Sequence, residues 1–365
     1  MQEAVDDGGA SDSAKVKAIA FYLPQFHPIP ENDAAWGAGF TEWRHVSEAK
    51  PLFPGHWQPR LPADLGFYDL RVPEVREQQV SLAKEAGISA FCYYHYWFAG
   101  HQVLERPFNE VLASGRPDFP FCLCWANESW TGIWHGRPAD IILEQTYPGA
   151  EDHLAHFDIL ARAFADRRYL RINGKPVFLI FRPLNIPDLA ATLSLWREAA
   201  LRYGFPGLHL VAVRTYTHPW NPADYGFDAS VTFRHPLIPA EYDRSIVRDV
   251  PWVIQHEQIL EYLVEPRQPG LFDYPCTGPG WDNTPRCGNR GIVFHDSTPE
   301  HFAQALEVAA TNARQLPPGQ RLCFIKAWNE WGEGNYLEPD QRFGHGWLTA
   351  VRQVLDRVNG VIARE

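Results

Sequence analysis

The chain has 365 residues, of which 45% are hydrophobic and 21% are charged. This composition predicts a folded globular protein with a large core, and the length allows one large domain or two medium ones. The formal net charge of −11 argues against nucleic acid or an anionic membrane surface as a partner, because a polyanion would be repelled. A neutral substrate fits this charge better, and the sequence specifies no oligomeric state.

Residues 1–14 are polar and acidic, and we expect a disordered N-terminal tail there, followed by a single catalytic domain over residues 15–365. The tail contains no apolar segment like that of a signal peptide, and no later apolar run approaches the roughly 18 residues of a membrane span. We therefore expect a cytoplasmic protein without a membrane span, with a periplasmic or secreted one as the alternative if a signal has been removed.

Along the chain, apolar strand-like runs alternate with segments of helical spacing. The runs predict strands over 16–23, 89–97, 121–126, 176–181, 208–213, 229–233, 291–294 and 321–327. Helices are expected over 72–87, 107–114, 151–168, 186–203, 298–315 and 346–359. Strands that are buried on both faces read as continuous apolar runs, as these do. The series predicts an α/β fold, a single (β/α)₈ TIM-type barrel with long βα loops.

The alternative fold is a doubly wound open sheet, which normally has a Gly-rich phosphate loop after its first strand. In this chain the residues from Pro24 to Pro28 occupy that position, which favours the barrel. Two irregular stretches, 24–71 and 234–290, are longer than ordinary connections. Long loops in compact domains usually carry function, so we expect both stretches to contribute to a site.

The six cysteines do not form a metal-binding or disulfide framework. Cys92, Cys122, Cys124 and Cys323 lie in apolar strand-like runs, where thiols act as small buried hydrophobes. Cys276 and Cys287 lie in a Gly/Pro-rich loop and could pair in an oxidising compartment. No His or Cys spacing is typical of a metal site, so we expect neither a metal nor a cofactor.

Active sites of barrels lie at the carboxyl ends of the strands, and three predicted strands end in aromatic, amide and acidic residues. Carboxylates act as acid, base or nucleophile at the anomeric carbon of a sugar, and aromatic rings cover the apolar faces of pyranoses. The pattern predicts a carbohydrate-active enzyme with an oligo- or polysaccharide substrate. The candidate substrate-binding residues at these strand ends are Tyr94, Tyr96, Trp125, Asn127, Glu128, Trp130, Trp328, Asn329 and Trp331.

Glu330 and Glu333 are the candidate catalytic residues. Residues three apart on a strand face opposite sides, so both can enter one cleft only if the chain turns, which Gly332 and Gly334 permit. The alternative is structural: Glu330 would pair with an arginine and Glu333 would cap the next segment. Asn127 and Glu128 could likewise form a helix cap or a surface ion pair.

The long loops supply further candidates. Glu42 and Trp43 could form a sugar-binding wall or simply pack. Trp281, Asn283 and Arg286, with the intervening Asp282, could form a lid over the cleft or a braced loop. We expect Glu338, before Pro339, to be structural.

Five motifs of this chain resemble a known family, at residues 20–33, 39–43, 125–130, 280–286 and 328–334. They are similar to WbsX-type proteins of bacterial polysaccharide gene clusters, a group similar to glycoside hydrolase family 99, the endo-α-mannosidases and endo-α-mannanases. The resemblance implies a (β/α)₈ barrel without a metal. It also implies a retaining mechanism in which Glu330 deprotonates the sugar 2-hydroxyl, which attacks the anomeric carbon to give a 1,2-anhydro sugar. Glu333 would protonate the leaving oxygen and later activate water.

The family has a histidine between the tryptophan and the second glutamate, and this chain has Gly332 there. The resemblance therefore does not carry mannose specificity over to this chain. Our leading hypothesis is a retaining glycoside hydrolase acting on a bacterial surface or secreted polysaccharide, such as a lipopolysaccharide.

Two other functions compete with the hydrolase. A glycosyltransferase of O-antigen biosynthesis is the label that WbsX-type proteins have often carried, although such enzymes usually need an acidic metal site or a nucleotide cleft, and no Asp-x-Asp closes a strand here. A non-catalytic saccharide-binding protein is the third hypothesis, and the retention of both acids counts against it.

Overall fold

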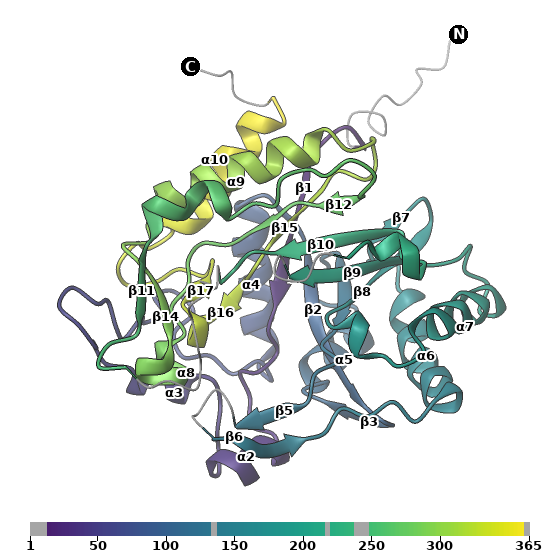
Figure 1. The fold of residues 1–365 in the computed structure, drawn as a ribbon, viewed down its shortest axis with the longest axis horizontal. Coiled ribbons are helices and arrows are strands. Elements are labelled where there is room, and N and C mark those ends of the chain that lie inside the picture. The colour runs from purple at the N-terminus through teal and green to yellow at the C-terminus, as the bar shows by residue number, and fades with distance from the viewer. Residues whose placement is uncertain (1–12, 133–136, 216–219, 237–247, 361–365) are drawn as a thin grey trace.

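The computed structural model describes residues 13–132, 137–215, 220–236 and 248–360 (Figure 1). Its main sheet is a nearly closed parallel barrel, in the order β12-β10-β9-β8-β4-β2-β1-β15-β13. This confirms the predicted TIM-type architecture. The strands of the barrel are β1 (Lys17–Tyr22), β2 (Ile88–Phe98), β4 (Phe121–Trp125), β8 (Lys175–Ile180), β9 (His209–Thr215), β10 (Ala229–Phe233), β12 (Asp273–Tyr274), β13 (Cys276–Thr277) and β15 (Leu322–Ile325).

Aromatic side chains fill the interior of the barrel. Phe21 of β1 contacts Phe233 of β10 edge to face, with ring centroids 5.0 Å apart. Strands β1 and β10 are not neighbours in the sheet, so this contact crosses the barrel. Tyr94 and Phe324 also lie against Phe21, at 5.5 and 5.6 Å. Offset and edge-to-face rings pack densely, so the barrel is a filled core rather than a pore.

One predicted barrel strand was placed wrongly. The run at 291–294 forms β14 (Ile292–His295), which pairs with β11 (Trp252–Gln255) in a separate two-stranded sheet. The barrel position between β10 and β15 belongs instead to β12 and β13, which Pro275 separates. Each has only two residues, and a proline cannot donate to the ladder, so no long apolar run marks this position. Strand β14 is apolar because it packs in a second small core.

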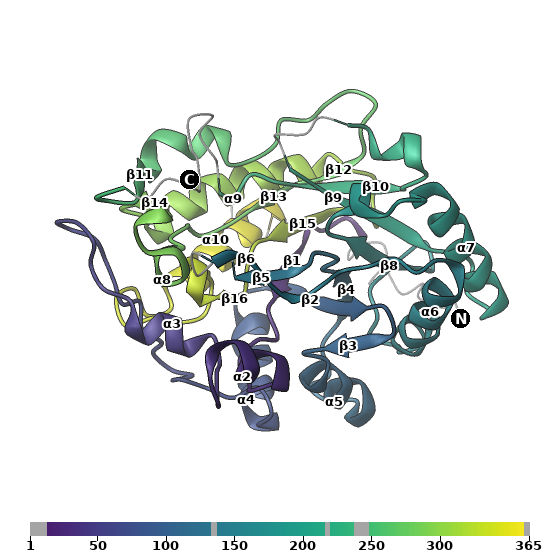
Figure 2. The ribbon, with the colours of Figure 1, turned by 60° about the horizontal axis from the view of Figure 1, so that its bottom comes forward.

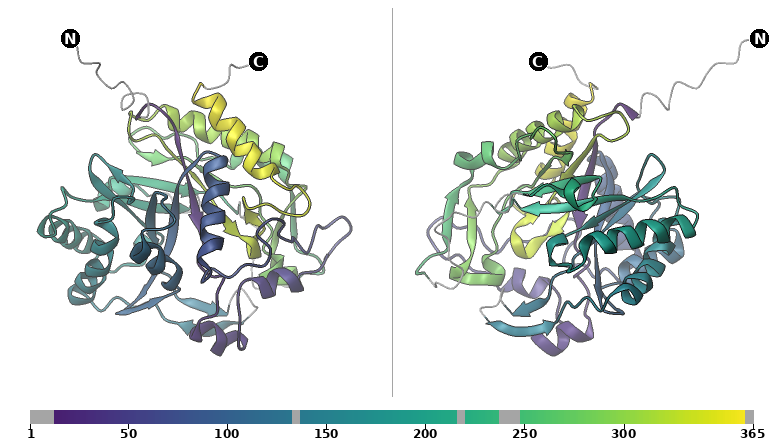
Figure 3. Two further views of the ribbon diagram at one scale, coloured as in Figure 1. Left: turned by 180° about the vertical axis from the view of Figure 1, so that it is seen from behind. Right: turned by 45° about the vertical axis from the view of Figure 1, so that its right-hand side comes forward.

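All six predicted helices are present. They are α4 (Pro73–Glu85), α5 (Arg106–Ser114), α6 (Ala150–Phe164), α7 (Leu189–Arg202), α9 (Pro299–Arg314) and α10 (Gly346–Val358). Helices α9 and α10 lie side by side against one side of the barrel, and α6 and α7 pack together on the opposite side (Figure 1). Figure 3 shows α4 next to α10 behind the barrel. Their apolar faces cover the outer surface of the parallel strands, as parallel sheets require.

Short elements of the long loops gather at the carboxyl end of the barrel, which faces the viewer more closely in Figure 2. The stretch 24–71 carries α2 and α3 there, and the stretch 234–290 carries α8. Over the whole described chain, the short elements are α2 (Pro30–Trp36), α3 (Trp43–Glu48), β3 (His101–Val103), β5 (Trp130–Gly132), β6 (Arg137–Leu143), β7 (Arg171–Ile172), α8 (Thr284–Cys287), β16 (Asn329–Glu330) and β17 (Asn335–Tyr336), with 3₁₀ turns at Pro183–Asn185, Pro222–Tyr225, His256–Tyr262, Gly288–Arg290 and Trp331–Glu333. Strand β7 pairs with the first residues of β8, at the amino end of that strand.

Several expectations concern the ends and the cysteines. Residues 1–12 of the expected tail lie outside the described residues, whereas the carbonyl of Ser13 accepts a hydrogen bond from Gly319 N at 2.7 Å. No disulfide joins Cys276 and Cys287, both of which the structure describes. In the described ranges, no helix has the length and apolar character needed to cross a bilayer.

Candidate active site

The two candidate acids lie on a tight turn after the last barrel strand. Strands β16 and β17 pair antiparallel, with Glu330 opposite Asn335, and a 3₁₀ turn joins them. Gly334 has a φ of 58°, a left-handed conformation that glycine adopts without steric cost. Asn329 fastens the turn to the end of β1, because its side chain accepts from Leu23 N at 2.8 Å and donates to Leu23 O at 3.0 Å. The turn therefore presents Glu330 and Glu333 on the same side.

A cavity of about 420 Å³ opens at this end of the barrel. Its volume is within the range of small-molecule sites. Both acids contribute to its wall, together with six aromatic rings and several charged groups. The lining residues are Leu23, Gln25, Asn32, Trp36, Phe40, Glu42, His45, Tyr94, Tyr96, Ala126, Glu128, Ser129, Trp130, Thr131, Ile142, Phe181, Arg182, Arg286, Lys326, Glu330 and Glu333.

Two cations bind Glu333 more tightly than Glu330. Arg286 Nη1 donates to Glu333 Oε1 at 2.7 Å, and Lys326 Nζ donates to Glu333 Oε2 at 3.1 Å. Of these two cations, Lys326 alone forms an ion pair with Glu330 in the described part of the chain, at 3.8 Å. All four groups are buried or nearly so, and electrostatic interactions are stronger in such surroundings than in water.

The two carboxyl groups therefore differ in protonation. Burial raises the pKa of Glu330 to about 8, and the hydrogen-bonded neighbour Glu333 adds to the rise. Burial alone would also raise the pKa of Glu333, but Lys326 and Arg286 outweigh it and lower that pKa to about 2. At neutral pH the pair holds one proton, on Glu330, and the charge is on Glu333. Pairs of carboxyl groups with separated pKa values are typical of acid–base catalysis.

The structure brings seven of the fifteen sequence-predicted site residues to the cavity wall. They are Tyr94, Tyr96, Glu128, Trp130, Arg286, Glu330 and Glu333. Glu128 also accepts from Arg182 Nε at 2.7 Å, so the ion pair that the sequence left open exists at the cavity rim. Tyr96 and Trp130 contact edge to face, with centroids 5.2 Å apart. These two rings form an aromatic part of the cavity wall.

The other eight lie outside the described cavity lining, where they support it. Tryptophan side chains dominate this set because large rings fill space under a loop-rich surface. Trp331 stacks on Tyr336 at 3.7 Å and donates to Glu338, and Asn127 holds Arg182 N through its Oδ1 at 2.7 Å. The eight residues are Trp43, Trp125, Asn127, Trp281, Asn283, Trp328, Asn329 and Trp331.

Sequence reasoning missed Lys326 and the Phe181–Arg182 pair, whereas Glu42, which the sequence left open between a sugar-binding wall and simple packing, contributes to the cavity lining. Lys326 is a lone charge at the end of an apolar strand, four residues before Glu330, and that signal was available. Phe181 ends the run at 176–181, and Arg182 lies over its ring at 4.4 Å. The contribution of Glu42 depends on how the first long loop folds back, which no local pattern reveals.

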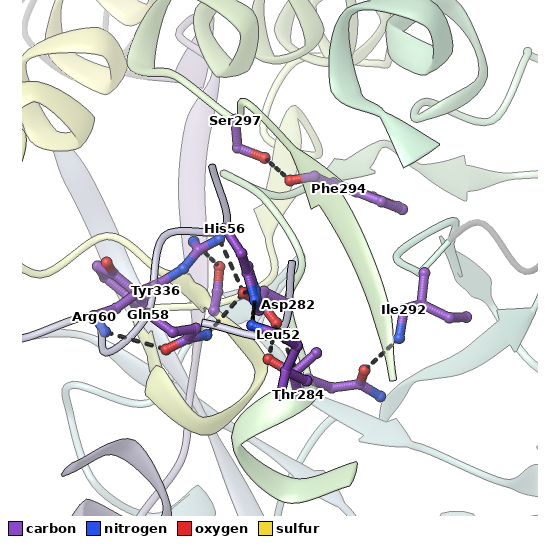
Figure 4. Close-up of polar contacts among 12 residues, drawn as sticks. Leu52, His56, Gln58, Arg60, Asp282, Thr284, Ile292, Phe294, Ser297 and Tyr336 are labelled. Atoms are coloured by element: carbon purple, nitrogen blue, oxygen red, sulfur yellow. Dashed lines mark hydrogen bonds and ion pairs between the residues drawn. The ribbon is translucent and has the colours of Figure 1, made fainter. Parts of the chain in front are cut away.

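A buried polar cluster stands behind the turn (Figure 4). The carboxylate of Asp282 accepts from His56 Nε2 at 2.9 Å, from Gln58 Nε2 at 2.7 Å and from Thr284 Oγ1 at 2.6 Å. Its backbone N–H donates to Glu333 O at 2.6 Å, and Arg60 Nη1 donates to Gly334 O at 3.1 Å. Asp282 therefore braces the turn that carries the two candidate acids from outside the cavity lining.

No group of three or more His, Cys, Asp or Glu side chains in the described part of the chain is arranged to hold a metal ion. The charged residues of the cavity instead pair with one another. The chemistry that this arrangement supports is proton transfer between a buried carboxyl pair and a polar ligand that the aromatic rings cover.

Comparison with solved structures gives the class of fold. The GH99 endo-alpha-mannosidase from Bacteroides thetaiotaomicron superposes with a TM-score of 0.58 at 15% identity, covering 94% of this chain and 97% of that one. A glycoside hydrolase-like protein gives a TM-score of 0.57, also at 15% identity, covering 93% and 94%. At this identity the likeness shows a shared (β/α)₈ barrel fold.

The sequence gives the family. Residues 18–351 match the family described as glycosyltransferase WbsX, and the chain belongs to it. The uncharacterized protein WxcX from two strains of Xanthomonas campestris pv. campestris is 42% identical over 361 residues, which cover 94% of this chain and 50% of the relative. The chain thus spans about half the length of the curated relatives it matches.

Proposed function

We propose that this domain is a retaining glycoside hydrolase that acts on a bacterial surface or secreted polysaccharide. The observation that carries the proposal is the Glu330–Glu333 pair, which holds a single proton in the wall of an aromatic-lined cavity. An acid and a base side by side suit the cleavage of a glycosidic bond, where one proton must be given and one taken.

Attack by the sugar's own 2-hydroxyl fits the adjacency of the two groups. In the common retaining scheme the carboxyl groups flank the anomeric carbon about 5–5.5 Å apart, and one of them attacks it. Here the two carboxyl groups hydrogen-bond to each other, so neither is placed across the sugar ring from the other as a flanking nucleophile requires, whereas O2 can attack C1 from the face opposite the leaving oxygen. A participating 2-hydroxyl needs no nucleophile from the protein.

The charges favour Glu330 as the acid and Glu333 as the base, which exchanges the roles implied by the resemblance. In the first step Glu333 takes the 2-hydroxyl proton, O2 attacks C1, and the leaving oxygen departs with the proton of Glu330. In the second step Glu330 takes a proton from water, whose oxygen opens the 1,2-anhydro ring at C1, and Glu333 returns its proton to O2. Two inversions at C1 give retention, and both carboxyl groups regain their starting states.

The roles are tested with Glu330→Gln and Glu333→Gln on glycosides that differ only in the leaving group. Glu330→Gln should lose about 10²–10⁴-fold in kcat/KM on poor leaving groups, because these need a proton, and much less on a dinitrophenyl leaving group. Glu333→Gln should slow both kinds. The opposite pattern would return the roles to those implied by the resemblance, and full activity of both variants would remove the pair from the mechanism.

A glycosyltransferase is the second candidate, because the family description names one. The same first step followed by attack of a sugar hydroxyl instead of water would transfer the glycosyl group. Incubation with polysaccharide and an acceptor sugar, with products followed by NMR, separates the two. Free reducing ends of retained configuration support the hydrolase, and a new glycosidic bond as the main product supports the transferase.

A further inference from the structure

Glu42 reaches the acid pair from the first long loop. It is only 2% exposed, yet it contributes to the cavity lining. Its Oε1 accepts from Arg286 Nε at 2.6 Å, and the same guanidinium donates to Glu333 through Nη1. One arginine therefore joins Glu42 directly to a proposed catalytic carboxylate. Such a planar fork holds two carboxylates in a fixed relative orientation.

The chain makes room for Glu42 at Gly332. A Cβ atom on residue 332 would overlap Glu42 Oε1 and lie 2.9 Å from Arg286 Nε. The φ of Gly332 is not in the left-handed region, so close approach rather than backbone conformation requires the glycine. The Glu42 carboxylate thus occupies the space that a side chain between Glu330 and Glu333 would take.

Every arginine and lysine of the described cavity lining already pairs with a glutamate. Arg286 pairs with Glu42 and Glu333, Lys326 pairs with the two acids, and Arg182 pairs with Glu128. Burial, with Arg286 and Arg44, lowers the pKa of His45 to about 4, so this side chain is neutral at physiological pH. An anionic ligand would meet three ionised glutamates, Glu42, Glu128 and Glu333, and no cation of the described lining that lacks a carboxylate partner. A neutral ligand meets hydrogen-bond acceptors and aromatic rings.

Only one oxygen of Glu42 is in use. Oε1 receives the arginine, and Oε2 has no hydrogen-bond partner among the described residues, although a carboxylate has about four acceptor positions. Glu42 Oε2 is therefore available to accept a hydrogen bond from a ligand.

We propose that Glu42 is a specificity-determining residue whose Oε2 accepts a hydrogen bond from a hydroxyl of an uncharged sugar unit, and that the site rejects uronate and phosphorylated sugars. The inference rests on the proposed glycosidase, because it concerns the same cavity. A site built to accept a hydroxyl discriminates strongly against ligands that leave its carboxylate unpaired or bring a second negative charge.

Glu42→Gln is the sharpest variant. Its amide oxygen still accepts from Arg286, while its NH₂ group replaces the free acceptor. The matched control is Glu48→Gln, at the exposed end of α3, the helix that Glu42 immediately precedes. Both variants and the wild type are applied to an array of neutral and uronate-containing bacterial oligosaccharides. We expect the wild type to bind neutral glycans, Glu42→Gln to bind them about 10-fold more weakly, and Glu48→Gln to match the wild type.

Monodeoxy versions of the bound glycan separate a hydrogen-bonding role of Glu42 from a purely structural one. A structural role would not change how much affinity is lost when a single hydroxyl is removed. One hydroxyl deletion should weaken the wild type about 10-fold and leave Glu42→Gln unaffected, because the partner is already gone. Preference for uronates, or equal binding by wild type and Glu42→Gln, would overturn the inference. A separate assay of reducing ends tests the hydrolase: binding without hydrolysis defeats only the proposed activity, and hydrolysis that is unchanged in Glu42→Gln defeats only the role of Glu42.

Discussion

Single residues set the charge state of the site. Glu330 and Glu333 are three positions apart, yet Arg286 from a distant loop and Lys326 from the preceding strand end separate their pKa values. Position in the sequence could not have assigned the proton, because the pKa of Glu333 is lowered by two cations, Lys326 and Arg286, and the second lies 47 residues away from Glu333. The assignment has a consequence for stability that does not depend on any substrate.

The shared proton predicts a pH-dependent loss of stability. Unfolded Glu330 releases its proton near its ordinary pKa of 4.5, whereas the folded protein keeps it up to about pH 8. Between these values the native state binds the extra proton, so the free energy of unfolding falls as the pH rises, by at most about 1.4 kcal/mol per pH unit. Urea unfolding at pH 5 and 7.5 should show this slope in the wild type and a smaller one in Glu330→Gln.

Glu338 serves as an internal control for that measurement. Burial raises its pKa to about 7, so it contributes a slope of the same sign, but equally in both proteins. The difference between wild type and variant therefore belongs to the acid pair. Equal slopes would mean that Glu330 is ionised in the folded protein.

Gly332 should tolerate no side chain while Glu42 is present. Gly332→Ala places a methyl group on Glu42 Oε1, so either the catalytic turn or the Glu42–Arg286 pair must shift, and we expect a loss of about 1–3 kcal/mol. The double variant Gly332→Ala/Glu42→Ala removes the overlap. In that background the alanine should cost much less, as urea unfolding of the four proteins of the cycle will measure. Additive losses would contradict the close approach.

At the scale of elements, the long strands and helices were predictable and the short ones were not. Runs such as 89–97 and 298–315 carry their own period, and the structure confirms them as β2 and α9. Strands β12 and β13 have two residues each, and their pairing partners define them rather than any local pattern. The motif after β15 indicated the two acids, which do line the cavity. Trp328 and Trp331 of the same motif were predicted to bind sugar, whereas the structure buries both rings outside the described cavity lining.

The turn that carries the acids is held by its neighbours, chiefly by the loop around Asp282. Asp282→Asn keeps the shape but removes the charge that His56, Gln58 and Thr284 surround. We expect a loss of about 2–4 kcal/mol, because charge-assisted bonds in a buried site are replaced by weaker ones. The kcat should fall while KM changes little, because Asp282 touches the turn and not the cavity.

Urea unfolding and steady-state kinetics of Asp282→Asn check both effects. Asp249→Asn, an exposed aspartate on the loop before β11, is the matched control and should be near neutral. A variant that is as stable as the control would show that the cluster does not brace the turn.

At the scale of the whole molecule, the first and last elements close the barrel on each other. Strand β1 pairs with β15, from Lys17 opposite Leu322 onward, and β1 also carries the Leu23 backbone that Asn329 holds. The seam between β1 and β15 thus joins the turn that carries Glu330 and Glu333. Such non-local pairing must offset the entropy of closing a long loop, so the contacts at the seam contribute to the stability of the whole barrel.

Asn359, just after α10, connects the C-terminal helix to the residue that precedes β1. Its Oδ1 accepts from Val16 N at 2.8 Å, and its Nδ2 donates to Val16 O at 3.2 Å, so one side chain satisfies both backbone groups of the residue that precedes β1. Asn359→Ala leaves those groups unpaired, and we expect a loss of about 1–3 kcal/mol in the free energy of unfolding. Gln353→Ala, exposed on the same helix, should change it by less than about 0.5 kcal/mol.

The pairing of β1 with β15 also predicts the shape of the urea unfolding curve of Asn359→Ala. If β1, β15 and α10 unfold as part of one cooperative barrel, Asn359→Ala should lower the urea midpoint without changing the slope of the transition or adding a second phase. Tryptophan fluorescence and far-ultraviolet circular dichroism should then report coincident curves. Two separated transitions would show that the ends detach before the barrel unfolds, and that the catalytic turn depends on the seam less than the Asn329–Leu23 bonds indicate.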